Sequence, residues 1–135
     1  MRYLAIDYGL KRTGLAICDA SETIVSPLMV IDSPKGLIDK IASVIETEKV
    51  EEVVIGLPLN MDDSQGPQAK LAVKFAEQLK KRITVPIHFQ DERLSSFAAE
   101  EKIAAAQYTR SKKKQRLDAI AAAEILQLFL EHKSS

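Results

Sequence analysis

Short apolar runs dominate the first third of this chain of 135 residues. Residues 2–7 and 13–19 are nearly continuous apolar runs, and the short link between them contains Gly9, as in a β-hairpin. A third apolar run, 23–31, contains Pro27, and a proline inside a strand indicates an edge strand or a β-bulge. The pattern therefore predicts three consecutive strands that are connected by tight turns.

The hydrophobic period then changes from that of strands to that of helices. Ser33 and Pro34 form a typical helix start, and apolar residues recur at helical spacing through 34–48. A short buried strand is predicted at 51–58 because this apolar run ends in a glycine and a proline. The polar loop after it leads into a second amphipathic helix, predicted at 67–82.

The rest of the chain repeats this alternation once and then becomes helical. Residues 84–93 predict another strand, and 97–106 predict a helix that follows two serines able to cap it. The polar and basic stretch 107–116 has the composition of a loop. The last helix is predicted at 116–131, with an apolar face.

Three strands followed by alternating helices and strands predict an α/β fold, with a mixed sheet of about five strands and helices on both faces. A chain of 135 residues is long enough for one core and too short for two, so residues 1–135 are expected to form a single domain. In sheets of this kind, ligands bind at the carboxyl ends of the parallel strands.

Composition restricts the class of protein. The chain is 46% hydrophobic and 28% charged, which is typical of a soluble globular protein. No apolar run is long enough to span a membrane, and the N-terminus lacks the layout of a signal peptide. The single cysteine, Cys18, lies in an apolar segment and suits a reducing compartment, so we expect a cytoplasmic protein.

The charges of the chain balance, but they are not evenly distributed. There are 19 basic and 19 acidic residues, so no overall charge favours binding to nucleic acid. The segment "RSKKKQR" at 110–116 nevertheless contains five basic residues and no acid. Such a run is either a solvated surface or a local site for a polyanion. The bases at 80–82 are best explained as a solvated helix end.

Acidic residues lie where the strands are predicted to end. Asp7 closes the first strand, Asp91 and Glu92 lie near the end of the last strand, and Asp118 lies in the first turn expected for the final helix. Taken singly, each acid has a structural explanation, as a turn cap, an ion pair with Arg93 or a favourable helix N-terminal charge.

Taken together, these acids indicate a cation site. Carboxylates that meet at one edge of a sheet repel one another and must be protonated or neutralised. A hard divalent cation does this with oxygen ligands, whereas one cysteine and two distant histidines do not suit a softer metal. Lys11, Arg12 and Arg93 lie close to these acids in the chain, as phosphate-binding bases would in a phosphodiesterase.

Four motifs support a more specific interpretation: "DYGLKRTGLAICD", "VVIGLPLNMD", "DERLSS" and "KKKQRLDAIAAAEIL". In this order they resemble the YqgF/RuvX family of bacterial pre-16S ribosomal RNA nucleases, which are also described as Holliday junction resolvases. The resemblance extends over about residues 2–130. It implies a ribonuclease-H-like fold and a hydrolase that depends on Mg²⁺ or Mn²⁺ and matures the 5′ end of small-subunit ribosomal RNA.

The resemblance also assigns roles to particular residues. It implies that Asp7, Glu92 and Asp118 are catalytic and bind the metal, with Asp91 as an alternative or additional ligand. Nucleic acid would be bound by Lys11, Arg12, Asn60, Arg93, Arg110, Lys112, Lys113, Lys114 and Arg116. The chain departs from the family pattern at 61–63, where "MDD" replaces the usual "MDG".

Other functions remain open at this point. The substrate could be precursor ribosomal RNA or branched DNA, and the protein could be a monomer or a homodimer. The segment "DYGLKRTG" also resembles the first phosphate hairpin of actin-like ATPases, although the chain has room for only one of their two lobes. A third alternative is a noncatalytic nucleic-acid-binding factor in ribosome assembly or transcription, in which the acids are structural.

Overall fold

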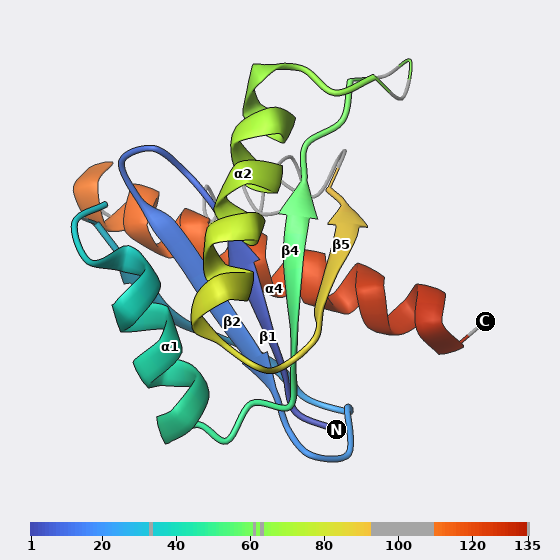
Figure 1. The fold of residues 1–135 in the computed structure, drawn as a ribbon. Helices are drawn as coiled ribbons and strands as arrows, with labels where there is room; N and C mark the ends of the chain where they lie inside the picture. Colours follow the sequence, from blue (N-terminus) through green and yellow to red (C-terminus); the bar gives the residue numbers. More distant parts are fainter. Residues whose placement is uncertain (33, 61, 63, 93–109, 135) are drawn as a thin grey trace.

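Five strands and three helices make up the part of the chain that the structure describes. The computed structural model describes residues 1–32, 34–60, 62, 64–92 and 110–134, apart from the side chains of 110–116 and 134. The elements are β1 (Tyr3–Asp7), β2 (Thr13–Cys18), β3 (Val25–Ile31), α1 (Leu37–Thr47), β4 (Glu52–Leu57), α2 (Pro67–Arg82), β5 (Ile87–Asp91) and α4 (Arg110–Ser134). Helices α1 and α2 cover one face of the sheet, and α4 crosses the other (Figure 1). The predicted mixed sheet with helices on both faces is confirmed.

The strand order β3-β2-β1-β4-β5 brings three parallel strand ends together. Strand β1 pairs antiparallel with β2 and parallel with β4, and β4 pairs parallel with β5. The carboxyl ends of β1, β4 and β5 therefore lie at the same edge of the sheet. Strand β3, which contains Pro27, lies at the edge of the sheet. Its register against β2 shifts between Leu15 and Ala16, as in a β-bulge. The proline therefore indicated both the edge position and the irregular pairing.

The pleat of the sheet divides the buried side chains into two cores. In β1, Leu4 and Ile6 pack with α1 and α2, whereas Tyr3 and Ala5 pack with α4. Asp7 continues the second set, since alternate residues of a strand point to the same face. The position of α4 across the sheet thus decides which side chains can meet Asp7.

Helix α4 approaches the sheet closely at Gly14 of β2. A Cβ atom on Gly14 would overlap with the carbonyl oxygen of Asp118 and lie 2.9 Å from the backbone nitrogen of Ala119. The missing side chain therefore allows the helix backbone to rest on the strand. This contact fixes the height of Asp118 above the sheet.

Two predicted boundaries differ from the structure because of local backbone geometry. Helix α1 begins at Leu37 rather than Pro34, since Gly36 has φ 70°, a left-handed conformation that ends the preceding turn. Strand β5 begins at Ile87 rather than at residue 84, directly after Pro86, which has no backbone N–H to donate.

The prediction of a loop at 107–116 was wrong for its last seven residues. Residues 110–116 are the first two turns of α4, so the basic segment is helical, and Asp118 lies well inside the helix rather than in its first turn. The stretch contains good helix formers and neither glycine nor proline, and it continues an already packed helix. The helix predicted at 97–106 lies outside the described residues.

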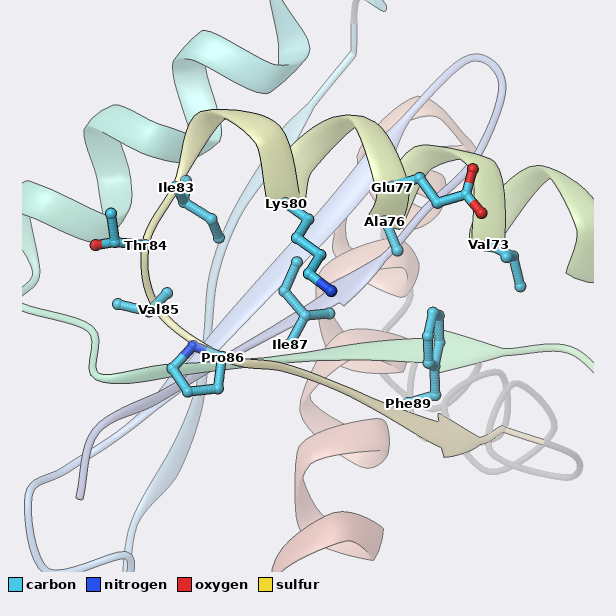
Figure 2. Close-up of a pocket in the computed structure, with 10 residues that line it drawn as sticks. All are labelled: Val73, Ala76, Glu77, Lys80, Ile83, Thr84, Val85, Pro86, Ile87 and Phe89. Carbon is cyan, nitrogen blue, oxygen red and sulfur yellow. The ribbon is translucent and has the colours of Figure 1, made fainter.

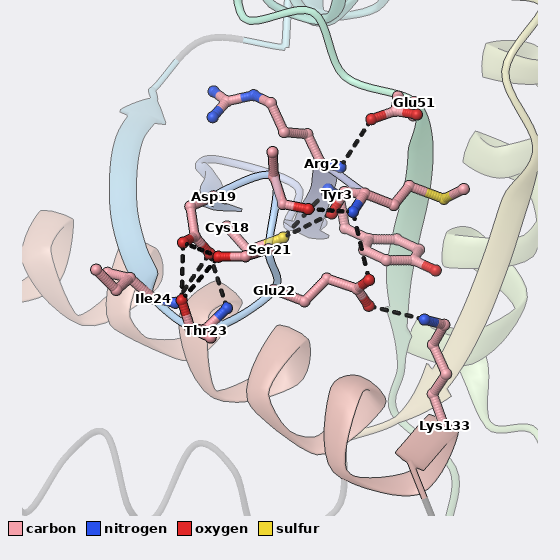
Figure 3. A network of polar contacts seen from close by, with 12 residues as sticks. Arg2, Tyr3, Cys18, Asp19, Ser21, Glu22, Thr23, Ile24, Glu51 and Lys133 are labelled. Atoms are coloured by element: carbon pink, nitrogen blue, oxygen red, sulfur yellow. Dashed lines mark hydrogen bonds and ion pairs between the residues drawn. The ribbon is translucent and has the colours of Figure 1, made fainter.

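The far end of α4 is attached to the β2–β3 turn (Figure 3). The antiparallel pairing of β1 and β2 puts this turn at the end of the strands opposite Asp7. Lys133 donates a hydrogen bond of 2.7 Å to Glu22 and lies over the ring of Tyr3. Within the turn, Asp19 accepts hydrogen bonds from the backbone N–H of Ile24 and from the hydroxyl groups of Ser21 and Thr23, and these bonds hold the pKa of Asp19 well below its usual range. Helix α4 is therefore anchored to the sheet both at Asp118 and near its C-terminus.

Helix α4 has 25 residues, but it is too polar to cross a membrane. The same holds for every other helix in the described part of the chain.

We expect Gly14→Ala to destabilise the protein by about 1–3 kcal/mol, because the added methyl group pushes the backbone of α4 away from β2. Urea unfolding followed by circular dichroism measures this change. Gly36→Asn is the control, because its side chain enters open space and asparagine tolerates a positive φ. Equal stability of the two variants would show that the contact at Gly14 does not hold the helix.

Candidate active site

Asp7 lies at the carboxyl end of β1 on the face that α4 covers. It is the last residue of a strand whose other residues are buried. The next residue, Tyr8, turns to the opposite face and stacks on Phe75 of α2, with ring centroids 4.4 Å apart. The backbone on both sides of Asp7 is thus held by packing, which leaves its carboxyl group in a fixed place.

Glu92 directly follows β5, and its backbone N–H donates a hydrogen bond to the carbonyl of Leu57 at the end of β4. Its side chain occupies space that Gly56 leaves open, since a Cβ atom at Gly56 would overlap with the carboxylate of Glu92 and lie 2.5 Å from Ile125 of α4. Glu92 therefore lies on the α4 face and reaches Asp7, with which it shares a hydrogen bond.

The neighbouring acid, Asp91, belongs to the other face. It continues the set of Ile87 and Phe89, which lie beside α2. Because alternate strand residues point to opposite faces, Asp91 points away from Asp7. Between the two acids that the sequence left as alternatives, the geometry favours Glu92.

Asp118 approaches the same place from helix α4. Its carboxylate accepts a hydrogen bond of 2.7 Å from Nε of Arg12, which lies in the link between β1 and β2. Both side chains are partly buried, with 32% of Arg12 and 26% of Asp118 exposed. The two residues are distant in the chain, so the fold itself brings the third acid to this edge.

The three carboxyl groups influence one another strongly. Burial, followed by the charges of Glu92 and Asp118, raises the pKa of Asp7 well above its usual range. Burial also raises the pKa of Glu92, although the hydrogen bond from Asp7 opposes the rise. Two carboxyl groups at hydrogen-bonding distance cannot both be ionised cheaply, so in the absence of a metal the pair favours one shared proton over two negative charges.

The chemistry of these side chains fits a hard divalent cation, because all the donor atoms are carboxylate oxygens and their charges repel. As placed, however, no group of three His, Cys, Asp or Glu side chains in the described residues is arranged to hold an ion. The reason lies in the contacts above: Asp7 and Glu92 are hydrogen-bonded to each other, while Asp118 binds Arg12. Small side-chain rotations would be needed to bind a cation.

The structure gives less detail for the other predicted site residues. Lys11 is exposed beside Arg12, and Asn60 is exposed in the loop after β4, where its amide donates a hydrogen bond to Ser64. Arg93 lies outside the described residues, as do Met61 and Asp63 of the altered loop motif. For Arg110, Lys112, Lys113, Lys114 and Arg116 the structure describes the helical backbone alone.

Sequence reasoning missed the structural roles of Gly14 and Gly56. Each glycine lies inside a strand, and each leaves room for a site acid or for the helix that carries one. A glycine in the interior of a strand was the available signal, because it weakens the strand unless another group must come close.

A separate groove lies on the other face of the sheet, between α2 and β5 (Figure 2). It has a volume of about 620 Å³ and an apolar lining that includes Val73, Ile83 and Phe89. Its charged lining residues are Glu77 and Lys80. This groove therefore lacks the three acids and is separated from them by the sheet.

Comparison with known proteins gives matches along nearly the whole chain. A family described as "RuvX: Holliday junction resolvase" matches residues 1–132. A protein of Maridesulfovibrio salexigens is 39% identical over 132 residues, which cover 96% of this chain and 98% of the relative. One of Caldanaerobacter subterraneus is 38% identical over 139 residues, with coverage of 100% and 99%. Both relatives carry the name "Putative pre-16S rRNA nuclease".

Two solved structures share the fold at low sequence identity. Thermus thermophilus RuvC in complex with a Holliday junction substrate has a TM-score of 0.62 at 16% identity, with coverage of 100% of this chain and 97% of that one. The fowlpox virus resolvase, bound to Holliday junction DNA, has a TM-score of 0.60 at 14% identity, and the match covers 100% of this chain and 100% of that one. At these identities the likeness is one of fold alone.

We expect Asp7→Asn to stabilise the metal-free protein at pH 8. The folded Asp7–Glu92 pair keeps its proton to a higher pH than the unfolded carboxyl groups do. Stability should therefore fall as the pH rises from about 4 through the raised folded-state pKa values. In EDTA at pH 8, the variant should melt about 3–6 °C above the wild type, equivalent to ~1 kcal/mol, and the gap should narrow at pH 5.

Asp39→Asn is the matched control for this experiment, since Asp39 is an exposed acid on α1 that pairs with Arg82. It should not change the pH dependence of the melting temperature. If Asp7→Asn melts at or below the wild type at pH 8, with the same pH dependence, the carboxyl groups do not repel as described.

Proposed function

This chain belongs to the RuvX family, and on that premise we propose that it is a divalent-metal-dependent nuclease in which Asp7, Glu92 and Asp118 bind the metal. The observation that supports this most strongly is the meeting of three acids from separate segments at the carboxyl ends of parallel strands. A structural cap or a surface ion pair does not require three mutually repelling carboxyl groups in one partly buried place.

The proposed reaction is hydrolysis of a phosphodiester, in which water adds to phosphorus and one P–O bond breaks. A bound Mg²⁺ or Mn²⁺ supplies positive charge that polarises the phosphate and favours ionisation of the attacking water. The protein contributes carboxylates on fixed backbone positions, since β1, the Gly56 clearance and helix α4 each position one of them. Asp7 and Glu92 would have to give up a shared proton to hold the ion, so binding would tighten as the pH rises.

The substrate backbone would be held by bases on either side of these acids. Lys11 and Arg12 lie on the link after β1, and residues 110–116 precede Asp118 on the same helix. With a rise of 1.5 Å per residue, the basic segment begins about 12 Å from Asp118 along the helix, roughly the length of three to four nucleotides of one strand. Contacts with phosphates of this kind position a strand without reading its sequence.

Precursor 16S ribosomal RNA is the substrate that we propose, because the curated relatives that cover the whole chain are named for it. Such a substrate implies action in the cytoplasm. A second candidate is a Holliday junction or another branched DNA, which the description of the matching family favours. The same carboxylates would serve either substrate, because the scissile bond is a phosphodiester in both.

We expect Asp7→Asn and Asp118→Asn each to reduce cleavage by about 1000-fold, since each removes a ligand charge with little change in volume. Purified protein is incubated with a labelled precursor of 16S ribosomal RNA and, separately, with a four-way DNA junction, with Mg²⁺ or EDTA. The wild type should cleave the RNA faster and only with Mg²⁺.

Asp39→Asn should cleave at the wild-type rate, because its exposed carboxylate lies on α1. Full activity of both site variants would disprove the assignment of the acids. Faster cleavage of the DNA junction would replace the proposed substrate and leave the proposed chemistry intact.

A further inference from the structure

The ion pair between Arg12 and Asp118 involves a carboxylate that the proposed metal site needs. We infer that Arg12 is a positioning residue that couples nucleic-acid binding to metal binding. In the free protein it holds Asp118, and a phosphate of the substrate draws it away so that Asp118 can turn to the cation. The inference rests on the proposed function but concerns a step before cleavage.

The geometry makes Arg12 the movable partner of this pair. The backbone at Asp118 lies against Gly14, and the next turns of α4 pack on the sheet through Ala122 and Ile125, so moving the helix away would expose buried side chains. Arg12 has a long side chain on the short link that precedes β2, and about a third of it is exposed. Rotation of the arginine side chain can therefore break the contact without moving an element of the fold.

A guanidinium group and a divalent cation compete for the same charge. Nε of Arg12 lies 2.7 Å from Oδ2 of Asp118, so the carboxylate is already neutralised while this pair is intact. A cation placed against Asp118 would also be repelled by the nearby guanidinium. While this pair is intact, the carboxylate of Asp118 is therefore engaged by Arg12 and is not available to a cation.

A phosphate offers Arg12 an alternative partner. Among the described residues, Arg12 makes its side-chain hydrogen bond through Nε. Both of its Nη groups can therefore bind a ligand. A guanidinium binds a phosphate through two parallel hydrogen bonds, a geometry that suits it better than a single contact with Asp118. Once Arg12 turns to a phosphate, Asp118 regains its full charge. By linkage, the metal must then strengthen nucleic-acid binding by the same factor.

Lys11 provides a matched control for the charge of Arg12. It is the adjacent base, it is exposed, and it makes no ion pair with the described residues. Lys11→Met and Arg12→Met remove the same charge from neighbouring positions, but only the second releases Asp118. A difference between them therefore reports on the contact and not on the net charge.

Calorimetric titration of the protein with Mn²⁺ tests the inference. Each titration is done with and without a 2′-O-methyl RNA oligonucleotide of about 20 nucleotides, and a gel verifies that the RNA stays intact. Without RNA, Arg12→Met should bind Mn²⁺ about two- to fivefold more tightly than Lys11→Met, the range expected for loss of a partly exposed pair. The RNA should tighten Mn²⁺ binding in the wild type and in Lys11→Met, and several-fold less in Arg12→Met. Arg12→Lys, which keeps a positive charge, should restore part of this coupling.

The possible results separate the inference from the proposed function. If Arg12→Met binds Mn²⁺ no more tightly than Lys11→Met and keeps the coupling of the wild type, the inference is wrong, although the metal site stands. If neither the wild type nor any variant binds Mn²⁺, even with RNA present, the metal site itself is disproved. Circular dichroism of each variant verifies that the fold is intact.

Discussion

Repulsion among three carboxyl groups is the constraint on which the described site depends. Asp7, Glu92 and Asp118 meet in a partly buried place, where water does not screen their like charges as it does at the surface. The metal-free protein reduces this repulsion in two ways, with a proton shared by Asp7 and Glu92 and with the positive charge of Arg12 beside Asp118. A divalent cation would replace both, which is why we interpret the cluster as a metal site.

Two glycines and one ion pair help the fold to maintain this costly arrangement. Gly14 lets helix α4 rest directly on β2, and Gly56 makes room for Glu92 beside Ile125. At the far end, the bond between Lys133 and Glu22 attaches the same helix to the β2–β3 turn. Since α4 packs on the sheet from the Gly14 contact to its C-terminal turn, moving Asp118 away with its helix would break buried contacts.

The fold and the meeting of the acids were predictable because both follow from periodicity. Alternation in β1 places Asp7 on the α4 face, and strand order brings β1, β4 and β5 to one edge. The start of α4 was not predictable from composition, because the polar residues 110–116 suit both a loop and an exposed helix. The contact of Arg12 with Asp118 joins positions 106 residues apart, and no local pattern reports such a contact.

The central claim is that these three carboxylates bind one shared ion. Anomalous scattering from crystals grown with Mn²⁺ and a 2′-O-methyl RNA oligonucleotide tests it most directly, because the metal is located without reference to activity. We predict an anomalous peak about 2.2 Å from carboxylate oxygens of Asp7, Glu92 and Asp118, with Arg12 turned away. A peak elsewhere on the molecule, or none at a manganese concentration that supports cleavage, would contradict the account.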